Sequence, residues 1–229
     1  MPLRLYFDLL SQPSRAVYMF LRMNNIPFEA KPVALRKGEH LGEEYKKINP
    51  FSLVPVIDDD GFKLTESIAI VKYMIQKRGL PDHWFPAQNF KKQARVEEYL
   101  LWYHINTRFP AALLFQHLLL IPRATGKPVD HKAVDKFRQK VNTMVSRLEG
   151  YFLKDQKYLA GDEISIADIF GACELIQLYA CHENALYEKS PIVKAWMERV
   201  QKDTNPYFDE AHKMVYRTND VYKEIAAKL

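Results

Sequence analysis

The segment Leu53-Val54-Pro55-Val56-Ile57-Asp58-Asp59-Asp60-Gly61-Phe62-Lys63-Leu64-Thr65-Glu66-Ser67 (residues 53–67) contains the signals that decide the fold. Its apolar run at 53–57 predicts a strand, 58–61 has the composition of a hairpin turn, and 62–65 predicts the return strand. A helix is expected from Ser67 to Gly79, because apolar residues recur there at helical spacing. The segment therefore predicts a β-hairpin followed by a helix.

The residues before this hairpin predict a strand, a helix and a second strand. Leu3, Leu5 and Phe7 alternate with polar neighbours, which is typical of a half-buried strand. A helix with an apolar stripe follows from about Pro13 to Asn24, then a strand at 28–34 and a short helical piece near 43–48. The order βαβ, ββ, α predicts a thioredoxin-like α/β domain over residues 1–80.

The rest of the chain carries only helical signals. Residues 81–89 include two prolines and are interpreted as a linker, and residues 90–229 predict an all-α C-terminal domain. One long helix is expected from Phe90 to about Leu120, kinked or broken near Pro110. Further helix starts are expected at Asp130, Ser165, Ser190 and Pro206, because the first three are capping residues and proline favours a first helical turn.

Composition narrows the class of protein. The 229 residues are 48% hydrophobic and 27% charged, as in ordinary globular proteins. No apolar run reaches the ~20 residues of a membrane span, and the N-terminus does not resemble a secretory signal, so we predict a cytoplasmic protein without membrane contact. The net charge of +5 comes without a run of five basic residues, so no nucleic-acid partner is expected.

The two cysteines and the histidines give no sign of a disulfide or a metal site. Cys173 and Cys181 are eight residues apart in one expected helix, too far for a disulfide, and are interpreted as buried small hydrophobic residues. No Cys/His cluster has the spacing of zinc ligands.

Ser11-Gln12-Pro13-Ser14 lies between the first strand and the first helix. Thioredoxin-type redox proteins carry two cysteines at this place, and serines cannot form the mixed disulfide of their reaction. A hydroxyl can instead donate a hydrogen bond to a thiolate on a substrate. Such a bond contributes ~1.5–3 kcal/mol and a helix N-terminus ~0.3–1 kcal/mol. Together they approach the ~2.7 kcal/mol that lowers a thiol pKa by two units. The alternative is a serine that only caps the helix.

Three further positions suit a peptide-like ligand. A cis bond before Pro55 would expose the backbone of Val54 for pairing, although an edge-strand proline is an equal alternative. Glu66 and Ser67, at a helix start, suit the ammonium and carboxylate of a free amino-acid end, or simply cap the helix. His40 follows Arg36 and Lys37 and could hold a second carboxylate, or lie in an exposed loop.

This combination of motifs closely resembles the cytosolic glutathione transferases, and the theta class in particular. The resemblance spans nearly the whole chain, and serine at the activating position separates theta-like enzymes from classes that use tyrosine. The stretches that carry it are 8–17 (DLLSQPSRAV), 26–28 (IPF), 37–41 (KGEHL), 49–55 (NPFSLVP), 64–70 (LTESIAI), 94–100 (ARVEEYL) and 164–168 (ISIAD).

The resemblance implies a role for each site residue. Ser11 would hydrogen-bond the glutathione sulfur, with Gln12 beside it. Glutathione would otherwise be held at its glycine end by His40 and Leu41, at its cysteinyl backbone by Leu53 and Val54, and at its γ-glutamyl end by Glu66 and Ser67. The helical domain would form the electrophile pocket from Trp102, His104, Ile105, Asn106, Thr107 and Arg108. Arg108 could stabilise a leaving group or the thiolate, or be a surface arginine.

The implied reaction is attack of the glutathione thiolate on a small hydrophobic electrophile, which gives a thioether in detoxification. Alkyl halides, epoxides and hydroperoxides are the expected substrates, with a peroxidase side activity on the last. The family typically forms homodimers and needs no metal. The alternative is a non-catalytic relative that serves as an interaction module, although such a relative would be expected to lose Ser11, Glu66 or Ser67.

Overall fold

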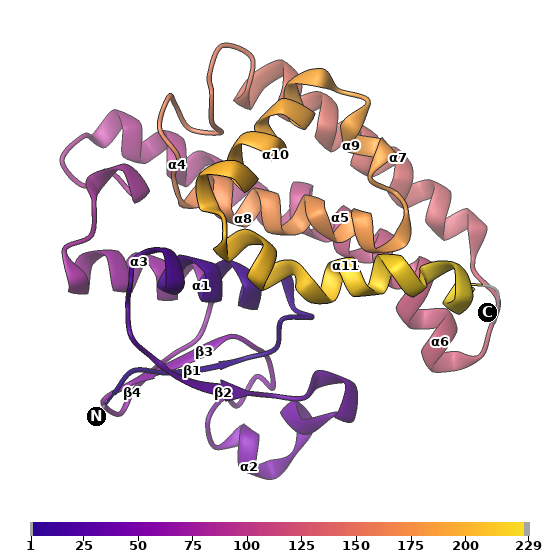
Figure 1. Ribbon diagram of the computed structural model, residues 1–229, viewed down its shortest axis with the longest axis horizontal. Coiled ribbons are helices and arrows are strands. Elements are labelled where there is room, and N and C mark those ends of the chain that lie inside the picture. Colours follow the sequence, from indigo (N-terminus) through magenta and orange to yellow (C-terminus); the bar gives the residue numbers. More distant parts are fainter. Residues whose placement is uncertain (1, 227–229) are drawn as a thin grey trace.

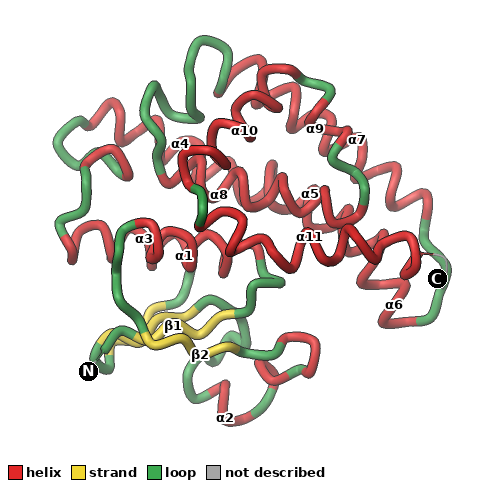
Figure 2. The backbone as a smooth tube through the Cα atoms, viewed as in Figure 1, coloured by secondary structure: helices red, strands yellow, loops and turns green. Residues whose placement is uncertain are grey.

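The computed structural model describes residues 2–226 and divides into a small α/β part and a larger helical part (Figure 1). This is the fold class that the sequence predicts. The sheet lies below α1 and α3, which separate it from the helical part (Figure 2). Residues 227–229 of the predicted helical domain lie outside the described residues.

The sheet has four strands in the order β2-β1-β3-β4. β1 (Arg4–Phe7) pairs in parallel with β2 (Glu29–Pro32) and antiparallel with β3 (Val56–Asp59), which pairs antiparallel with β4 (Phe62–Leu64). Leu5 and Phe7 of β1 are buried, whereas Arg4 and Tyr6 are half-buried, as their alternation predicts. The βαβ-ββ-α order is thus confirmed.

The third strand begins later than predicted, at Val56 rather than Leu53. Pro55 has no N–H to donate to a ladder, and the carbonyl oxygen of Leu53 already accepts bonds from the Tyr45 hydroxyl and the Asn49 amide, both at 2.7 Å. The strand also extends through Asp59, whose carboxylate is held by Tyr73 and Lys77. The hairpin turn is therefore Asp60-Gly61, where both residues have positive φ.

Three helices complete the α/β part: α1 (Gln12–Met23), the short α2 (Glu43–Lys46) and α3 (Ser67–Arg78). Helix α1 starts at Ser11, which caps it, and carries Pro13 in its first turn. Short 3₁₀ turns occupy Leu35–Lys37 and Glu39–Leu41, and another at Asp82–Trp84 lies in the segment that leads to the helical part.

The long helix of the second part is continuous and changes its winding instead of breaking at Pro110. It consists of α4 (Phe90–Tyr103), a π-helical turn (His104–Arg108), α5 (Phe109–Phe115), a second π turn (Gln116–Leu120) and α6 (Ile121–Thr125). Pro110 is the second residue after the first π turn. A π turn removes the requirement for a regular i→i−4 bond at the position where proline has no donor.

Helix α8 (Ile166–Leu175), all of whose residues are buried, packs against α1, α4 and α5. Further helices complete the helical part. They are α7 (His131–Arg147), which ends in a π turn at Leu148–Phe152, α9 (Ala185–Glu188), α10 (Pro191–Thr204) and α11 (Tyr207–Ala226). A 3₁₀ segment (Ile176–Cys181) extends α8. The starts predicted at Asp130, Ser165 and Ser190 are observed as capping residues, and Pro206 directly precedes α11.

Candidate active site

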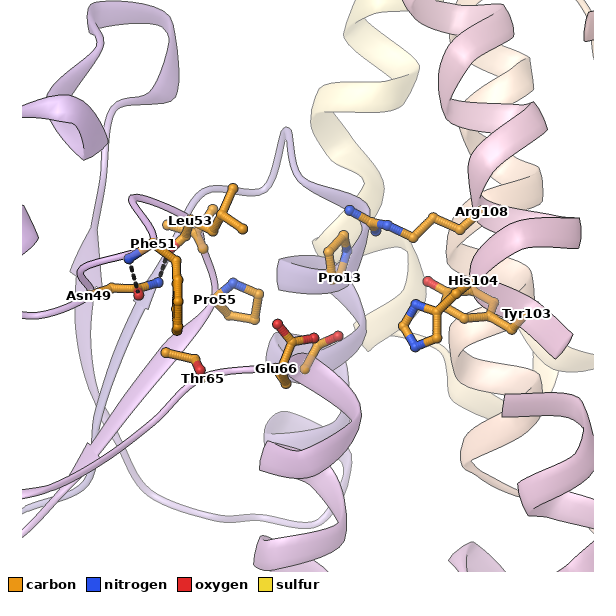
Figure 3. A pocket seen from close by; sticks show the side chains of 12 residues that line it. Pro13, Asn49, Phe51, Leu53, Pro55, Thr65, Glu66, Tyr103, His104 and Arg108 are labelled. Carbon is orange, nitrogen blue, oxygen red and sulfur yellow. Dashed lines mark hydrogen bonds between the residues drawn. The ribbon is translucent and has the colours of Figure 1, made fainter. Parts of the chain in front are cut away.

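A groove lies between the α/β part and the first long helix of the helical part (Figure 3). Its volume is about 220 Å³, many times the ~10–15 Å³ of such space that one water molecule needs, so it admits a small organic ligand. Six of the predicted site residues line it: Leu53, Val54, Glu66, Ser67, His104 and Arg108. The other lining residues are Pro13, Asn49, Phe51, Pro55, Thr65 and Tyr103.

The N-terminus of α1 lies at one end of this groove, where Pro13 lines it. Ser11 is half-buried, and its hydroxyl oxygen accepts a long bond of 3.4 Å from the backbone N–H of Ser14. No acidic side chain occupies the first turn, so the positive end of the helix dipole is not neutralised there. The Ser14 hydroxyl is buried and has no hydrogen-bond partner among the described residues.

The loop before β3 presents its backbone to the groove. The Val54–Pro55 peptide bond is cis. The side chain of Asn49 organises the loop, since it donates to the Leu53 carbonyl at 2.7 Å and accepts from the N–H of Phe51 at 3.0 Å (Figure 3). Among residues 2–226, neither the amide nor the carbonyl of Val54 makes a hydrogen bond, so both can pair with a ligand.

Glu66 and Ser67 occupy the start of α3 on the floor of the groove. Glu66 has φ 64° and ψ 105°, a conformation that costs a non-glycine residue about 1–3 kcal/mol. Its carboxylate makes no capping bond to α3 and is exposed in the groove (Figure 3). Ser67 is nearly buried at the first helical position. The strained backbone thus directs an uncapped carboxylate beside a helix N-terminus.

The predicted residues Ser11, Gln12, His40 and Leu41 do not line the groove itself, although Ser11 directly precedes the helix whose Pro13 does. Gln12 is the first residue of α1 and is half-buried. His40 and Leu41 lie in the 3₁₀ turn Glu39–Leu41, where Leu41 is exposed. The Nδ1 atom of His40 is buried and has no hydrogen-bond partner among the described residues.

The opposite wall of the groove carries a fixed positive charge. Arg108 donates at 2.9 Å to a carboxylate oxygen of Glu174, which is completely buried in α8, and the Tyr103 hydroxyl donates to the same oxygen at 2.7 Å. Burial lowers the pKa of Arg108, but the charges and hydrogen bonds of Glu174 and Tyr103 together outweigh it and leave that pKa above its usual value. The guanidinium extends across the groove toward Pro13, and His104 points to the side of Glu66 (Figure 3).

The structure does not bring the other four predicted electrophile-pocket residues into this groove. Trp102, Ile105 and Asn106 line a separate cavity of about 630 Å³ between α4 and α7. Thr107 is fully buried, and its hydroxyl lies 3.3 Å from that of Tyr99. The reason is helical geometry, because consecutive residues of a helix point in different directions and only those three or four apart share a face.

Sequence reasoning also missed several residues of the site. Glu174 gave a signal, since it is a carboxylate that directly follows the apolar run 169–173 of α8. Arg15 gave a similar signal, since it directly precedes the apolar stretch of α1, and in the structure it is 1% exposed. Both signals concern burial of a charge, which occurs in proteins only with a compensating partner.

Residues 2–226 contain neither a candidate metal site nor a helix that could span a membrane. No group of three His, Cys, Asp or Glu side chains is arranged there to hold a metal ion. None of the described helices is both long enough and apolar enough to cross a bilayer.

Comparison with known proteins identifies the family. Two family models match, the glutathione S-transferase N-terminal domain at residues 5–82 and the glutathione S-transferase C-terminal domain at residues 110–202. Glutathione S-transferase theta-1 of Bos taurus is 38% identical over 221 residues, covering 96% of this chain and 91% of that protein. Glutathione S-transferase theta-2 of Rattus norvegicus is 42% identical over 201 residues, covering 88% and 81%.

Solved structures agree with these relatives. Human glutathione transferase theta-2, in complex with glutathione and an unknown ligand, superposes with a TM-score of 0.90 at 35% identity, covering 99% of this chain and 91% of that chain. The apo form of human glutathione-S-transferase T1-1 gives 0.88 at 36% identity, covering 99% and 96%. This chain belongs to the theta class of the glutathione S-transferase family.

Proposed function

We propose that the Ser11 hydroxyl donates a hydrogen bond to the glutathione sulfur and so favours its thiolate form. The supporting observation is the position of Ser11 at the N-terminus of α1, beside the groove. Its oxygen accepts from Ser14 N–H and its proton remains free to donate. The uncompensated helix N-terminus stabilises the same negative charge.

The rest of the glutathione molecule is assigned to residues around the groove. The exposed Glu66 carboxylate suits the γ-glutamyl ammonium, and Ser67 with the α3 N-terminus suits the neighbouring carboxylate. The unpaired backbone of Val54 suits the cysteinyl amide, next to Leu53. His40 and Leu41 are assigned to the glycine end, and Gln12 to the neighbourhood of the sulfur.

The electrophile is proposed to bind between the sulfur and the helical wall. Attack on an alkyl halide or epoxide forms a carbon–sulfur bond and breaks the carbon bond to the leaving group, which departs with the electron pair. With a hydroperoxide the thiolate instead attacks an oxygen atom and breaks the O–O bond, which releases the alcohol, and a second glutathione converts the resulting sulfenic acid into glutathione disulfide and water. Arg108 is the cation that can stabilise that negative charge, and His104 lines the same wall. The substrates proposed are small alkyl halides, epoxides and hydroperoxides, which the cell detoxifies in this way.

We further propose that the protein acts as a homodimer in the cytoplasm. An exposed apolar stripe runs along the long helix, with Leu101 70%, Ile105 75% and Phe109 48% exposed. Contiguous apolar surface of this kind marks contact sites, and a second copy would cover it. Both cysteines are buried free thiols, as expected in a reducing compartment.

The proposed function is tested by assaying glutathione conjugation of an alkyl halide, an epoxide and an aromatic chloride, together with glutathione-dependent reduction of a hydroperoxide. We expect turnover of the small alkyl halide, epoxide and hydroperoxide, and little with the bulkier aromatic chloride. Tight glutathione binding without turnover of any compound would contradict the proposal and favour a non-catalytic interaction module.

A further inference from the structure

Arg15 is a charged side chain buried in the centre of the molecule. It lies on α1, one turn after Ser11, and is 1% exposed. Burial of a guanidinium removes its hydration, and this is the largest effect that lowers the pKa of Arg15. An ordinary core position would be filled by an apolar residue at lower cost.

The guanidinium of Arg15 joins the two parts of the chain. On one side, a terminal nitrogen donates to the carbonyl oxygens of Leu9 at 3.1 Å and Leu10 at 3.4 Å, immediately before Ser11. On the other side, the second terminal nitrogen donates to the Cys173 carbonyl at 3.1 Å and to the Gln177 side chain at 2.7 Å. Arg15 therefore links the loop before Ser11 to the α8 region of the helical part.

The same loop is held from its other side by Asp8. One carboxylate oxygen of Asp8 accepts from the N–H of Leu10 at 2.9 Å and the other from the N–H of Leu35 at 3.0 Å. The Asp8 carbonyl accepts from Ser11 N–H at 2.9 Å. Asp8 thus fixes the amides of Leu10 and Ser11, and Arg15 fixes the carbonyls of Leu9 and Leu10. The segment before Ser11 therefore has little conformational freedom. The direction of the Ser11 hydroxyl depends on this segment.

We infer that Arg15 is a positioning residue for Ser11. It holds the loop before Ser11 on α8, and only in this docked position does the serine hydroxyl stabilise the thiolate. This inference rests on the proposed role of Ser11. Lysine cannot replace Arg15 here, because one ammonium cannot reach acceptors on two sides as a planar guanidinium does.

A double-mutant cycle on the bound glutathione thiol tests the inference. The thiol pKa is measured from the ultraviolet absorbance of the thiolate in the enzyme–glutathione complex, for wild type, Ser11→Ala, Arg15→Lys and the double variant. We expect Arg15→Lys to raise the thiol pKa by about one unit, which is about tenfold less thiolate at a fixed pH below the pKa. In the Ser11→Ala background the same substitution is expected to have less than about 0.3 unit of effect.

The matched control is Arg22→Lys. Arg22 lies on the same helix and also contacts the helical part, through Glu210 at 2.9 Å, but it is two turns beyond Arg15 and partly exposed. It is expected to leave the thiol pKa unchanged. If Arg15→Lys does not fold, Gln177→Met replaces it in the cycle, since it removes only one acceptor of the guanidinium.

The outcomes separate this inference from the proposed function. An equal effect of the Arg15 or Gln177 substitution with and without Ser11 would overturn the inference, because Arg15 would then act independently of the serine. So would a loss of stability with no change in thiol pKa. If Ser11→Ala alone leaves the thiol pKa unchanged, the proposed function itself fails.

Discussion

Replacing Ser11 by alanine removes the proposed hydrogen bond to the sulfur while leaving the α1 N-terminus in place. A hydrogen bond to a charged group contributes ~1.5–3 kcal/mol. At 1.36 kcal/mol per pKa unit this corresponds to roughly one to two units. The helix N-terminus retains its ~0.3–1 kcal/mol in the variant. We therefore expect the pKa of bound glutathione thiol to rise by about one to two units without returning to its value in water.

The assay follows the thiolate absorbance of the complex and the conjugation rate over the same pH series. At a pH below both pKa values, the rate of the variant is expected to be about 10- to 100-fold lower, in proportion to the lost thiolate. As the pH rises past the raised pKa, the two rates should converge. A pH-independent loss would indicate a different role for the hydroxyl.

Stability distinguishes this chemical effect from loss of a helix cap. The Ser11 cap bond is long, 3.4 Å, so its removal should cost only about 0.5 kcal/mol, the low end of the range for caps. Ser190→Ala is the matched control, because Ser190 caps α10 at 3.2 Å and precedes a proline. It should lower the free energy of unfolding by about 1 kcal/mol without changing the thiol pKa. Equal thiol pKa values in wild type and Ser11→Ala would refute the reasoning.

Three further substitutions test other parts of the structure. Glu66→Gln should raise the KM for glutathione about 10- to 150-fold through loss of a charged hydrogen bond, with kcat at saturation nearly unchanged; a fall in kcat alone would contradict this role. Gly171→Ala should lower the urea midpoint of unfolding. The added Cβ would lie 2.6 Å from the Tyr99 hydroxyl, and the cost of this overpacking, about 1–3 kcal/mol, exceeds the ~1 kcal/mol that alanine gains in helix propensity. Burial, reinforced by Arg15, holds the pKa of His212 well below its usual value. The unfolded chain therefore binds one more proton at this histidine, and stability present above pH ~6.5 is lost as the pH falls below that value. His212→Gln should flatten the dependence of the melting temperature on pH. An unchanged slope would exclude His212 as the source of this dependence.

Most of the fold could be predicted because its signals are local. Alternation in β1, the hairpin at Asp60-Gly61 and the caps at Asp130, Ser165 and Ser190 each depend on residues a few positions apart. The start of β3 could not be predicted from its apolar run. It depends on which groups donate hydrogen bonds to the Leu53 carbonyl, and one of these donors is the Tyr45 hydroxyl, eight residues away.

The positions of the candidate site residues could be predicted only where a local structural signal marks them. Ser11, Glu66 and Ser67 lie at helix starts, where the residue types that cap a helix also have the groups that can bind a ligand. The helical wall is different, because six residues between 102 and 108 were assigned to one pocket although a helix turns about 100° per residue. His104 and Arg108, four apart, both line the groove. The partner of Arg108 is 66 residues away, and no spacing rule indicates it.

The distribution of charge explains why the groove needs both parts of the chain. The α/β part provides a hydroxyl, a helix terminus and an exposed carboxylate, but no cation lines the groove from that part among the residues described. The cation comes from Arg108, whose orientation depends on a carboxylate in the core of the helical part. Conversely, the loop before Ser11 in the α/β part depends on the helical part, since Arg15 joins this loop to α8. Because Glu174 and the Arg15 acceptors Cys173 and Gln177 lie within one turn of each other, a shift of α8 would move the serine and the arginine of the site together.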